Sequence, residues 1–371
     1  MLHFDRRLLL NFDWAIILTV LVIAGMGLLN LYSATHSAEP YAAAFVRQLY
    51  FYLLGFAGIM VIISFDYRLF VTANYPLYIT IILLLTIVLF FGNAVSDTQR
   101  WLNFGFFRLQ PSEPAKLVLV ITLASYYYRK DTGLGFTLKE LVVPLLLTGL
   151  PFLLILRQPD LGTALMLIFI FISMTLFVKL KWSTLSVLIG ACASMLPIGW
   201  LYLLKPYQKQ RILTLFNPEL DPMGSGYHIL QSKIAIGSGM MFGKGFLKGT
   251  QVHLDFLPER HTDFAFSVWA EEWGFIGSLF FLACYFFLIL MGLNIAVASR
   301  DKFGVLLAFG IVSLLFWQAF INLAMILGLL PVVGMPLPLF SYGGSSLLTT
   351  LAGIGILLNI RMRRFMTSTG D

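Results

Sequence analysis

The sequence predicts an all-α polytopic membrane protein with about ten transmembrane helices. Both termini are expected in the cytoplasm, with one large extracytoplasmic loop between helices 7 and 8. Three observations predict this fold. The 371-residue chain is 59% hydrophobic and only 12% charged, with a mean hydropathy of +0.86. Apolar runs long enough to cross about 30 Å of hydrocarbon recur along it. Arg and Lys are unevenly distributed between alternate loops.

Each predicted helix is an apolar run bounded by polar or charged residues. The runs cover residues 14–34, 46–65, 75–92, 114–128, 140–157, 161–178, 183–204, 265–297, 303–329 and 342–361. Residues 205–264 form the large loop within a single membrane domain, 1–371. The first run follows Arg6 and Arg7 and precedes further spans, so we interpret it as a retained anchor.

Orientation follows from the Arg and Lys residues of the short loops. A cytoplasmic N-terminus puts thirteen of them inside and five on the short outer segments and adjoining helix ends. The positive-inside rule therefore favours this orientation, and the basic run 361–364 requires an even number of spans. In such a chain the net charge of +7 indicates anchoring and anionic lipid headgroups rather than nucleic acid.

The outer side nevertheless carries many charged residues. They are Arg100, Arg108, Glu113, Lys116, Arg157, Asp160, Lys209, Arg211, Lys233, Glu259, Arg260, His261 and Asp263. Short outer segments are normally poor in Arg and Lys. The excess of cations there indicates a polyanionic ligand such as a diphosphate.

Residues 251–267 hold the densest group of ionisable side chains, where the large loop meets the eighth helix. Thr262 or Asp263 at the start of this helix is expected to cap it by accepting a backbone N–H. A carboxylate held ionised near a helix start also suits a general base. The sequence leaves both roles open for Asp263, and they are compatible.

Other charged residues also have a structural and a functional interpretation. Glu113 and Lys116 lie three residues apart at a helix start, which predicts either a local ion pair or a ligand contact. Asp160 is a good N-cap for the sixth helix, and the Arg157 side chain can reach the membrane surface. Glu271 and Glu272 are adjacent acids in the eighth helix, which indicates a function unless they lie above the hydrocarbon.

Glycine-rich segments suggest anion binding or ordinary packing. Gly243-Lys-Gly245 in the large loop and Phe340–Ser346 before the last helix both offer backbone N–H groups. A P-loop, HExxH, GxSxG and a Cys/His metal set are absent from the sequence. Cys192 and Cys284 lie in apolar runs, so neither a disulfide nor a metal site is predicted from cysteine.

Several motifs, in order and covering nearly the whole chain, resemble the SEDS family of bacterial cell-wall polymerases. They are Gln99-Arg-Trp101, Gln110-Pro-Ser-Glu-Pro-Ala-Lys116, Gln158-Pro-Asp-Leu-Gly-Thr163, Gly226-Tyr-His228, Phe256-Leu-Pro-Glu-Arg-His-Thr-Asp-Phe264 and Ser341-Tyr-Gly-Gly-Ser-Ser346. Four features favour the RodA-like elongation branch over the FtsW-like division branch: Ser232-Lys-Ile-Ala-Ile-Gly237, Gly243-Lys-Gly245, Gly249-Thr-Gln251 and Arg260 before His261.

The resemblance implies a peptidoglycan glycosyltransferase of cell elongation. It would polymerise lipid II into β-1,4 glycan strands at the outer face of the cytoplasmic (inner) membrane, with inversion. The family's essential acid falls on Asp263, the expected general base. The substrate-binding positions are expected at Glu113, Lys116, Arg100, Arg108, Arg157, Asp160, Lys233, His261, Thr262 and Ser345.

The resemblance also implies partners and leaves alternatives. A class B penicillin-binding protein (the transpeptidase) and other elongation-complex membrane proteins are the expected partners, without nucleic acid. A cofactor is not firmly implied; a divalent cation, Mg²⁺ or Mn²⁺, stays open, and its ligands are unknown. The alternatives are a lipid II flippase, a non-catalytic scaffold and the FtsW-like paralogue. A flippase needs polar residues deep in both halves of the membrane, whereas the charge here concentrates on the outer side.

Overall fold

The computed structural model describes residues 12–36, 42–95, 98–103, 108–130, 133, 135–203, 206–217, 221, 224–250 and 259–364. A helix occupies each of the ten predicted ranges. These helices are α2 (Trp14–Thr35), α3 (Ala42–Ser64), α4 (Leu69–Phe91), α5 (Ser112–Lys130), α6 (Leu138–Arg157), α7 (Leu161–Phe177), α8 (Trp182–Ile198), α12 (Ala265–Ala298), α13 (Lys302–Ile326) and α14 (Gly344–Met362). The predicted all-α class is thereby confirmed for the body of the molecule.

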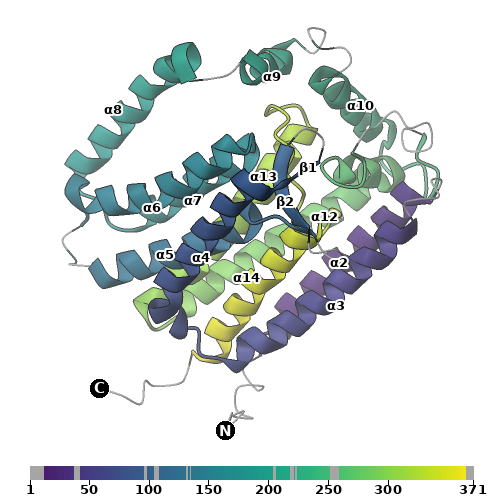
Figure 1. Cartoon of the computed structure of the whole chain (residues 1–371). Helices are drawn as coiled ribbons and strands as arrows, with labels where there is room; N and C mark the ends of the chain where they lie inside the picture. The colour runs from purple at the N-terminus through teal and green to yellow at the C-terminus, as the bar shows by residue number, and fades with distance from the viewer. Residues whose placement is uncertain are drawn as a thin grey trace.

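Seven helices of the described chain are long and apolar enough to cross a membrane: α2, α3, α4, α6, α12, α13 and α14. Helix α7 and the first part of α8 are apolar but shorter. The α5 helix begins with a buried Glu113 and ends with Arg129 and Lys130, so its uncharged stretch is shorter than the helix itself. Helices of both lengths lie together in one bundle (Figure 1).

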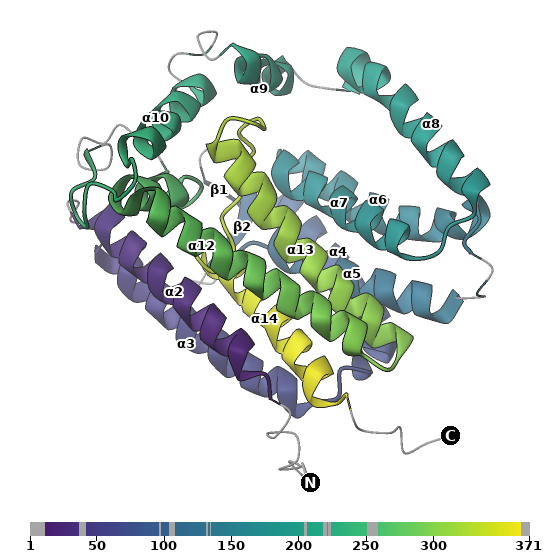
Figure 2. The same ribbon diagram turned by 180° about the vertical axis from the view of Figure 1, so that it is seen from behind.

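The centre of the bundle is formed by α13 and α14, the two candidate spans with the largest buried share. They pack against α12, α5 and α3, as the two opposite views show (Figures 1 and 2). The outer helices expose apolar side chains instead. Phe90 and Phe91 of α4 are 76% and 78% exposed. Large apolar side chains on an outer surface are stable in lipid but not in water, so this surface fits a bilayer.

The described part of the large loop contains helices that were not predicted. Helix α8 lies apart from the bundle and continues into a π-helical turn, η2 (Gly199–Leu203), which is followed by α9 (Pro206–Phe216) and α10 (Ser225–Ser238). Together these elements form an arc over one end of the bundle (Figure 1). No helices were predicted in 205–264, because α9 and α10 are only 11 and 14 residues long and are too polar to be recognised as membrane spans.

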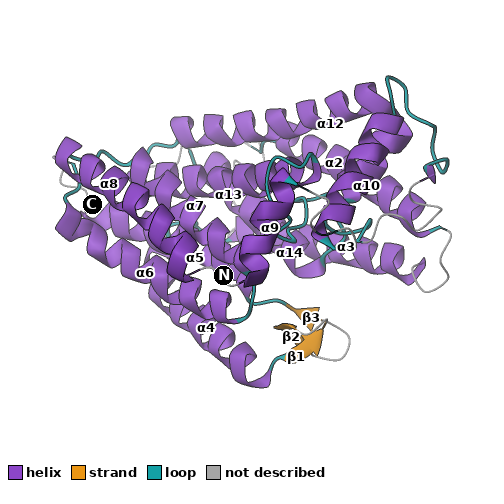
Figure 3. Cartoon of the chain, turned by 90° about the horizontal axis from the view of Figure 1, so that it is seen from above, coloured by secondary structure: helices purple, strands orange, loops and turns teal. Residues whose placement is uncertain are grey.

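A small antiparallel sheet lies beside the same end of the bundle and was also not predicted. Its strands are β1 (Asn93–Val95), β2 (Thr98–Asn103) and β3 (Arg108–Leu109), in that order (Figure 3). Strands of two to six residues are too short to give an alternating pattern. The sheet matters because it carries Arg100 and Arg108.

The two ends of the described chain lie together at the opposite end of the bundle. The Arg361 Nε atom is 3.4 Å from Asp13 Oδ2, which joins the end of α14 to the residue before α2. An even number of membrane crossings would bring the two ends to the same side in this way.

Candidate functional site

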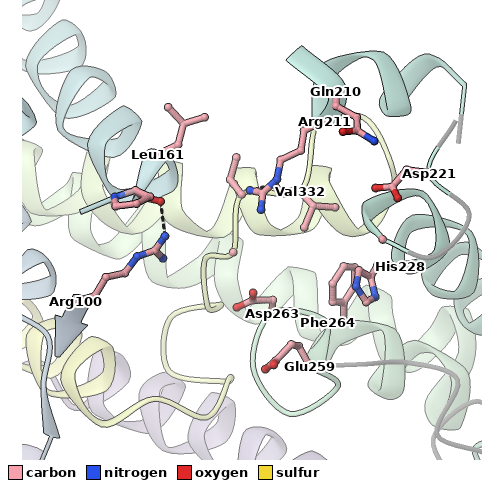
Figure 4. Close-up of a pocket in the computed structure, with 14 residues that line it drawn as sticks. Arg100, Leu161, Gln210, Arg211, Asp221, His228, Glu259, Asp263, Phe264 and Val332 are labelled. Carbon is pink, nitrogen blue, oxygen red and sulfur yellow. Dashed lines mark hydrogen bonds between the residues drawn. The ribbon is translucent and has the colours of Figure 1, made fainter. Parts of the chain in front are cut away.

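A pocket of about 470 Å³ opens where the sheet, the arc of loop helices and the start of α12 meet (Figure 4). This volume is within the ordinary range for small-molecule sites. Seven of its lining residues are charged or polar: Arg100, Gln210, Arg211, Asp221, His228, Glu259 and Asp263. The apolar part of the wall includes Phe264 and Val333. Arg100 and Asp263 are the predicted site residues that line the pocket.

Hydrogen bonds to several other segments fix the turn that carries Asp263. The Asn322 side chain of α13 donates to the Asp263 carbonyl at 2.9 Å, and the Tyr342 N–H donates to the His261 carbonyl at 2.9 Å. The Arg260 Nε–H donates to the Ala34 carbonyl of α2 at 3.0 Å. A backbone fixed by α2, α13 and the segment before α14 gives the Asp263 carboxylate a defined position.

The predicted helix cap is wrong. Helix α12 begins at Ala265, its N-cap is Phe264, and no side chain caps it. The Thr262 hydroxyl donates instead to Glu259, 2.9 Å from its Oε2 atom. The turn between Glu259 and Phe264 places Asp263 before the cap position, so its carboxylate faces the pocket between Arg100 and His228 (Figure 4).

The surroundings of Asp263 raise the pKa of its carboxyl to about 7. Removal from water is the largest cause, and the negative charges of Glu259 and Asp160 act in the same direction. The positive charge of Arg100 opposes the shift. Burial also lowers the pKa of His228, so this neighbouring imidazole favours its neutral form. A carboxyl with this pKa can both gain and lose a proton near neutral pH.

Arg100 is fixed at the opposite wall of the pocket by the turn between α6 and α7. Its Nε–H donates to the Gln158 carbonyl at 3.0 Å, and its Nη2 donates to the Pro159 carbonyl. Its Nη1 lies 3.9 Å from Asp160 Oδ1. Asp160 accepts from the Thr163 N–H at 3.2 Å, so the predicted N-cap of α7 is confirmed. The Asp160 carboxylate therefore both caps α7 and lies beside the Arg100 guanidinium.

Glu113 and Lys116 form the predicted ion pair, but they do not line the described pocket. The Lys116 Nζ atom is 2.9 Å from Glu113, and both side chains are almost fully buried in α5. Lys116 also donates to Gln318 Oε1 at 3.4 Å, and Gln318 donates to the Ser346 hydroxyl at 3.1 Å. This network joins α5 to α13 and the start of α14.

The other predicted substrate residues lie outside the pocket lining. Ser345 Oγ donates to the Arg108 carbonyl at 3.3 Å and accepts from the Gln110 N–H at 3.1 Å, so it joins α14 to the sheet. The His261 ring lies 5.9 Å from the Tyr342 ring. Arg108, Arg157 and Lys233 are exposed, on β3, at the end of α6 and on α10 respectively.

The folded loop adds pocket residues that were not selected from the sequence. Gln210 and Arg211 come from α9, and His228 comes from α10. The Arg211 Nη1–H donates to the Val332 carbonyl at 2.9 Å, which ties α9 to the segment after α13. Arg211 was already among the outer cations, but only the folding of α9 reveals that it faces the same cavity as Asp263.

The described residues offer no ready metal site. Within them, no group of three or more His, Cys, Asp or Glu side chains is placed to hold a metal ion. Two of the pocket acids, Asp263 and Glu259, influence each other electrostatically. Mg²⁺ is usually bound by one or two carboxylates together with substrate phosphates, so the divalent cation stays a prediction.

Fold and site together define a helical membrane protein with an acid–base pocket at one end of its bundle. The family model FTSW_RODA_SPOVE, described as "Cell cycle protein", matches residues 13–365. The chain therefore belongs to the FtsW/RodA/SpoVE family. This family is the one that the sequence motifs resemble, and the membership is confirmed.

Similar proteins agree on an activity. The peptidoglycan glycosyltransferase MrdB of Escherichia coli is 46% identical over 292 residues, covering 79% of this chain and 78% of that protein. A probable peptidoglycan glycosyltransferase FtsW of Trichlorobacter lovleyi is 38% identical, covering 95% and 93%. A solved structure, described as "Structural coordination of polymerization and crosslinking by a peptidoglycan synthase complex", has a TM-score of 0.81 at 33% identity, covering 96% and 99%. This chain is a multi-pass membrane protein and a peptidoglycan glycosyltransferase.

Proposed function

We propose that this protein polymerises lipid II at the outer face of the cytoplasmic membrane, with Asp263 as the general base. The observation that carries the proposal is the Asp263 carboxyl, whose pKa is raised to about 7 in a pocket that also contains Arg100. A base with a pKa near the working pH combines a useful ionised fraction with enough basicity to accept a proton.

The proposed reaction is a single inverting displacement. Asp263 accepts the proton of the acceptor sugar's 4-hydroxyl while that oxygen bonds to the anomeric carbon of the donor. The bond between the anomeric carbon and the diphosphate oxygen breaks, and the polyprenyl diphosphate leaves with the electron pair. Attack on the face opposite the leaving group converts an α-linked donor into a β-1,4 product.

Cations on the pocket walls would stabilise the departing diphosphate. Arg100 and Arg211 are anchored to backbone carbonyls on separate elements, so their positions are set before substrate binds. Preorganised positive charge lowers the energy of a developing anion without reorganisation. We assign substrate contacts farther along the outer surface to Arg108, Arg157 and Lys233. The buried Lys116 and Glu113, with Ser345, would hold the walls of the site.

The location and partner are also proposed. Both termini would lie in the cytoplasm and the pocket would face outward, as the distribution of Arg and Lys favours. The similar synthase complex, described as coordinating polymerization and crosslinking, supports a class B penicillin-binding protein as partner. The likeness to solved structures of a "Rod shape determining protein RodA" supports a role in elongation rather than division.

Polymerisation by the purified Asp263→Asn variant tests the proposed base. The protein, with its transpeptidase partner, is incubated with labelled lipid II, and glycan length is read on gels. We expect at least a hundredfold loss of glycan, because general-base catalysis contributes about 10²–10⁴-fold. Asp301→Asn is a matched control at the other end of the bundle, where Asp301 caps α13. Glycan formation by Asp263→Asn at the wild-type rate would refute the assignment.

A further inference from the structure

Helix α12 is broken soon after it begins, and a segment of the large loop occupies the break. Gly274 has φ 66° and ψ −159°, far from helical values, inside Ala265–Ala298. Residues 239–250, the clamp segment, contact both sides of this residue. Figure 2 shows α10, which leads into the clamp segment, beside the first turns of α12.

The clamp segment replaces two hydrogen bonds of the helix. In a continuous helix, the N–H groups of Phe275 and Ile276 would donate to the carbonyls four residues earlier. Here they donate to the Met240 and Met241 carbonyls at 2.8 and 3.1 Å. The carbonyls so released accept from the clamp segment instead: Glu271 from the Lys244 N–H and Glu272 from the Gly245 N–H, both at 3.0 Å.

Glycine makes this close approach possible. A Cβ atom on Gly243 would lie 2.0 Å from the Glu272 carbonyl oxygen, and one on Gly274 would lie 2.3 Å from the Gly243 nitrogen. Both residues also have positive φ, which glycine adopts without strain. The glycine–lysine motif Gly243-Lys-Gly245, which suggested anion binding in the sequence, is therefore used to fit the backbone into the helix break.

Glu271 fastens the clamp segment from the helix side. Its carboxylate is fully buried and lies 2.6 Å from the Lys244 Nζ atom. Its Oε1 atom also accepts from the Thr250 N–H at 2.9 Å and from the Thr250 hydroxyl at 3.1 Å. Charge-assisted hydrogen bonds of this kind are about twice as strong as neutral ones.

The break makes the position of Asp263 depend on this attachment. Residues 265–273 are separated from the rest of α12 by the loss of continuous helical bonding, and Asp263 lies just before them. We propose that Glu271 is a positioning residue for Asp263. By binding Lys244 and Thr250, Glu271 keeps the clamp segment in the helix break. The clamp segment in turn fixes the short helical segment that follows Asp263. This inference rests on the proposed role of Asp263 as the base.

A second contact on the same segment helps to define the test. Ser33 of α2 donates to the Glu272 carboxylate, and Asn30 donates to the Ala265 carbonyl at 2.9 Å. These bonds hold residues 265–273 against α2 whether or not the clamp segment is attached. Loss of the Glu271 attachment should therefore loosen the segment without unfolding it.

The experiment compares Glu271→Gln and Lys244→Met with wild-type protein in the lipid II assay. We expect glycan formation to fall about tenfold in each, because a displacement of about 1 Å can reduce a rate up to about a hundredfold. We also expect the acid limb of the rate–pH profile to move to lower pH, because a looser segment lets water reach Asp263. Lys244→Met removes the ion pair and the Lys244–Thr250 hydrogen bond but keeps both hydrogen bonds from Thr250 to Glu271, so it can be measured if Glu271→Gln does not fold.

The pH readout separates positioning from general stability. The charged or titratable groups that share the pocket with Asp263, or act on its pKa, are unchanged in both variants: Arg100, Asp160, Arg211, Asp221, His228 and Glu259. Asn359→Ala is the matched control. The Asn359 side chain donates to the Ile62 and Phe65 carbonyls at 2.7 and 2.6 Å near the other end of α14, so its loss should lower thermal stability and leave the acid limb in place.

Two results would overturn the inference. One is an unchanged rate and acid limb in Glu271→Gln and Lys244→Met, and the other is the same displacement of the limb in Asn359→Ala. Asp263→Asn in the same assay separates this inference from the proposed function. Activity in Asp263→Asn would refute the role of Asp263 itself. An inactive Asp263→Asn with wild-type profiles in the clamp variants would refute positioning alone.

Discussion

Asp263 derives its proposed reactivity from residues far away in the sequence. Its acidity is set by burial, by Glu259 nearby in the chain, and by Asp160 and Arg100 from distant segments. The sequence could single out Asp263 because it ends a polar loop and precedes an apolar helix. It could not show that Arg211 and His228 line the same pocket, because α9 and α10 bring them there.

At the residue scale, the charge of Glu259 is expected to tune the base. Glu259→Gln removes a negative charge that raises the pKa of Asp263, so this pKa should fall. The acid limb of the rate–pH profile should then move by a fraction of a pH unit to lower pH. Polymerisation rates measured from pH 5 to 9 check this, with Asp301→Asn as control. A shift to higher pH would contradict the electrostatic account.

Asp263 is also expected to reduce stability where it is ionised. Its carboxyl has a pKa of about 7 in the folded protein, against an ordinary value of 3.8. Folding therefore favours the protonated form of Asp263. The resulting loss of folding stability is absent below about pH 4, grows as the pH rises, and is complete above about pH 7. Asp263→Asn should raise the unfolding temperature by a few degrees at pH 8 and hardly at pH 4. Thermal unfolding in detergent measures this, and a lower unfolding temperature at pH 8 would contradict it.

At the element scale, apolar run length was sufficient to place a helix in each of the ten predicted ranges, including α8 outside the bundle. It could not locate the sheet, whose strands are too short, or α9 and α10, which are too short and too polar to be recognised as spans. It also could not locate the break at Gly274, because the apolar run continues through it. Gly243 and Gly274 become informative only when their two segments are known to be adjacent.

The buried ion pair of α5 gives a prediction at this scale. Lys116→Ala leaves the Glu113 carboxylate buried without its cation, which should destabilise the protein by about 3–5 kcal/mol. The double variant Glu113→Gln/Lys116→Met removes both charges and should recover most of this loss. The free energy of unfolding of wild type, the single variant and the double variant, measured in detergent, checks this. Equal destabilisation of both would show that the charge pair is not the cause.

At the scale of the whole molecule, the ion pair between Arg361 and Asp13 holds the two ends of the described chain together. The distribution of Arg and Lys in the sequence predicts that these ends lie in the cytoplasm. A fluorescent protein fused after Arg364 should fluoresce, and alkaline phosphatase fused after Asp221 should be active. Alkaline phosphatase activity from a fusion after Arg364 would contradict the proposed orientation.

The pH dependence of forming the first glycosidic bond tests the central claim most directly. Wild-type protein with saturating lipid II is sampled before chains elongate, between pH 5 and 9. If Asp263 is the base, the rate should level off above about pH 7 and fall about tenfold per pH unit well below it. A rate that stays constant from pH 5 to 8 would contradict the account, because a protonated Asp263 cannot accept the proton of the acceptor hydroxyl.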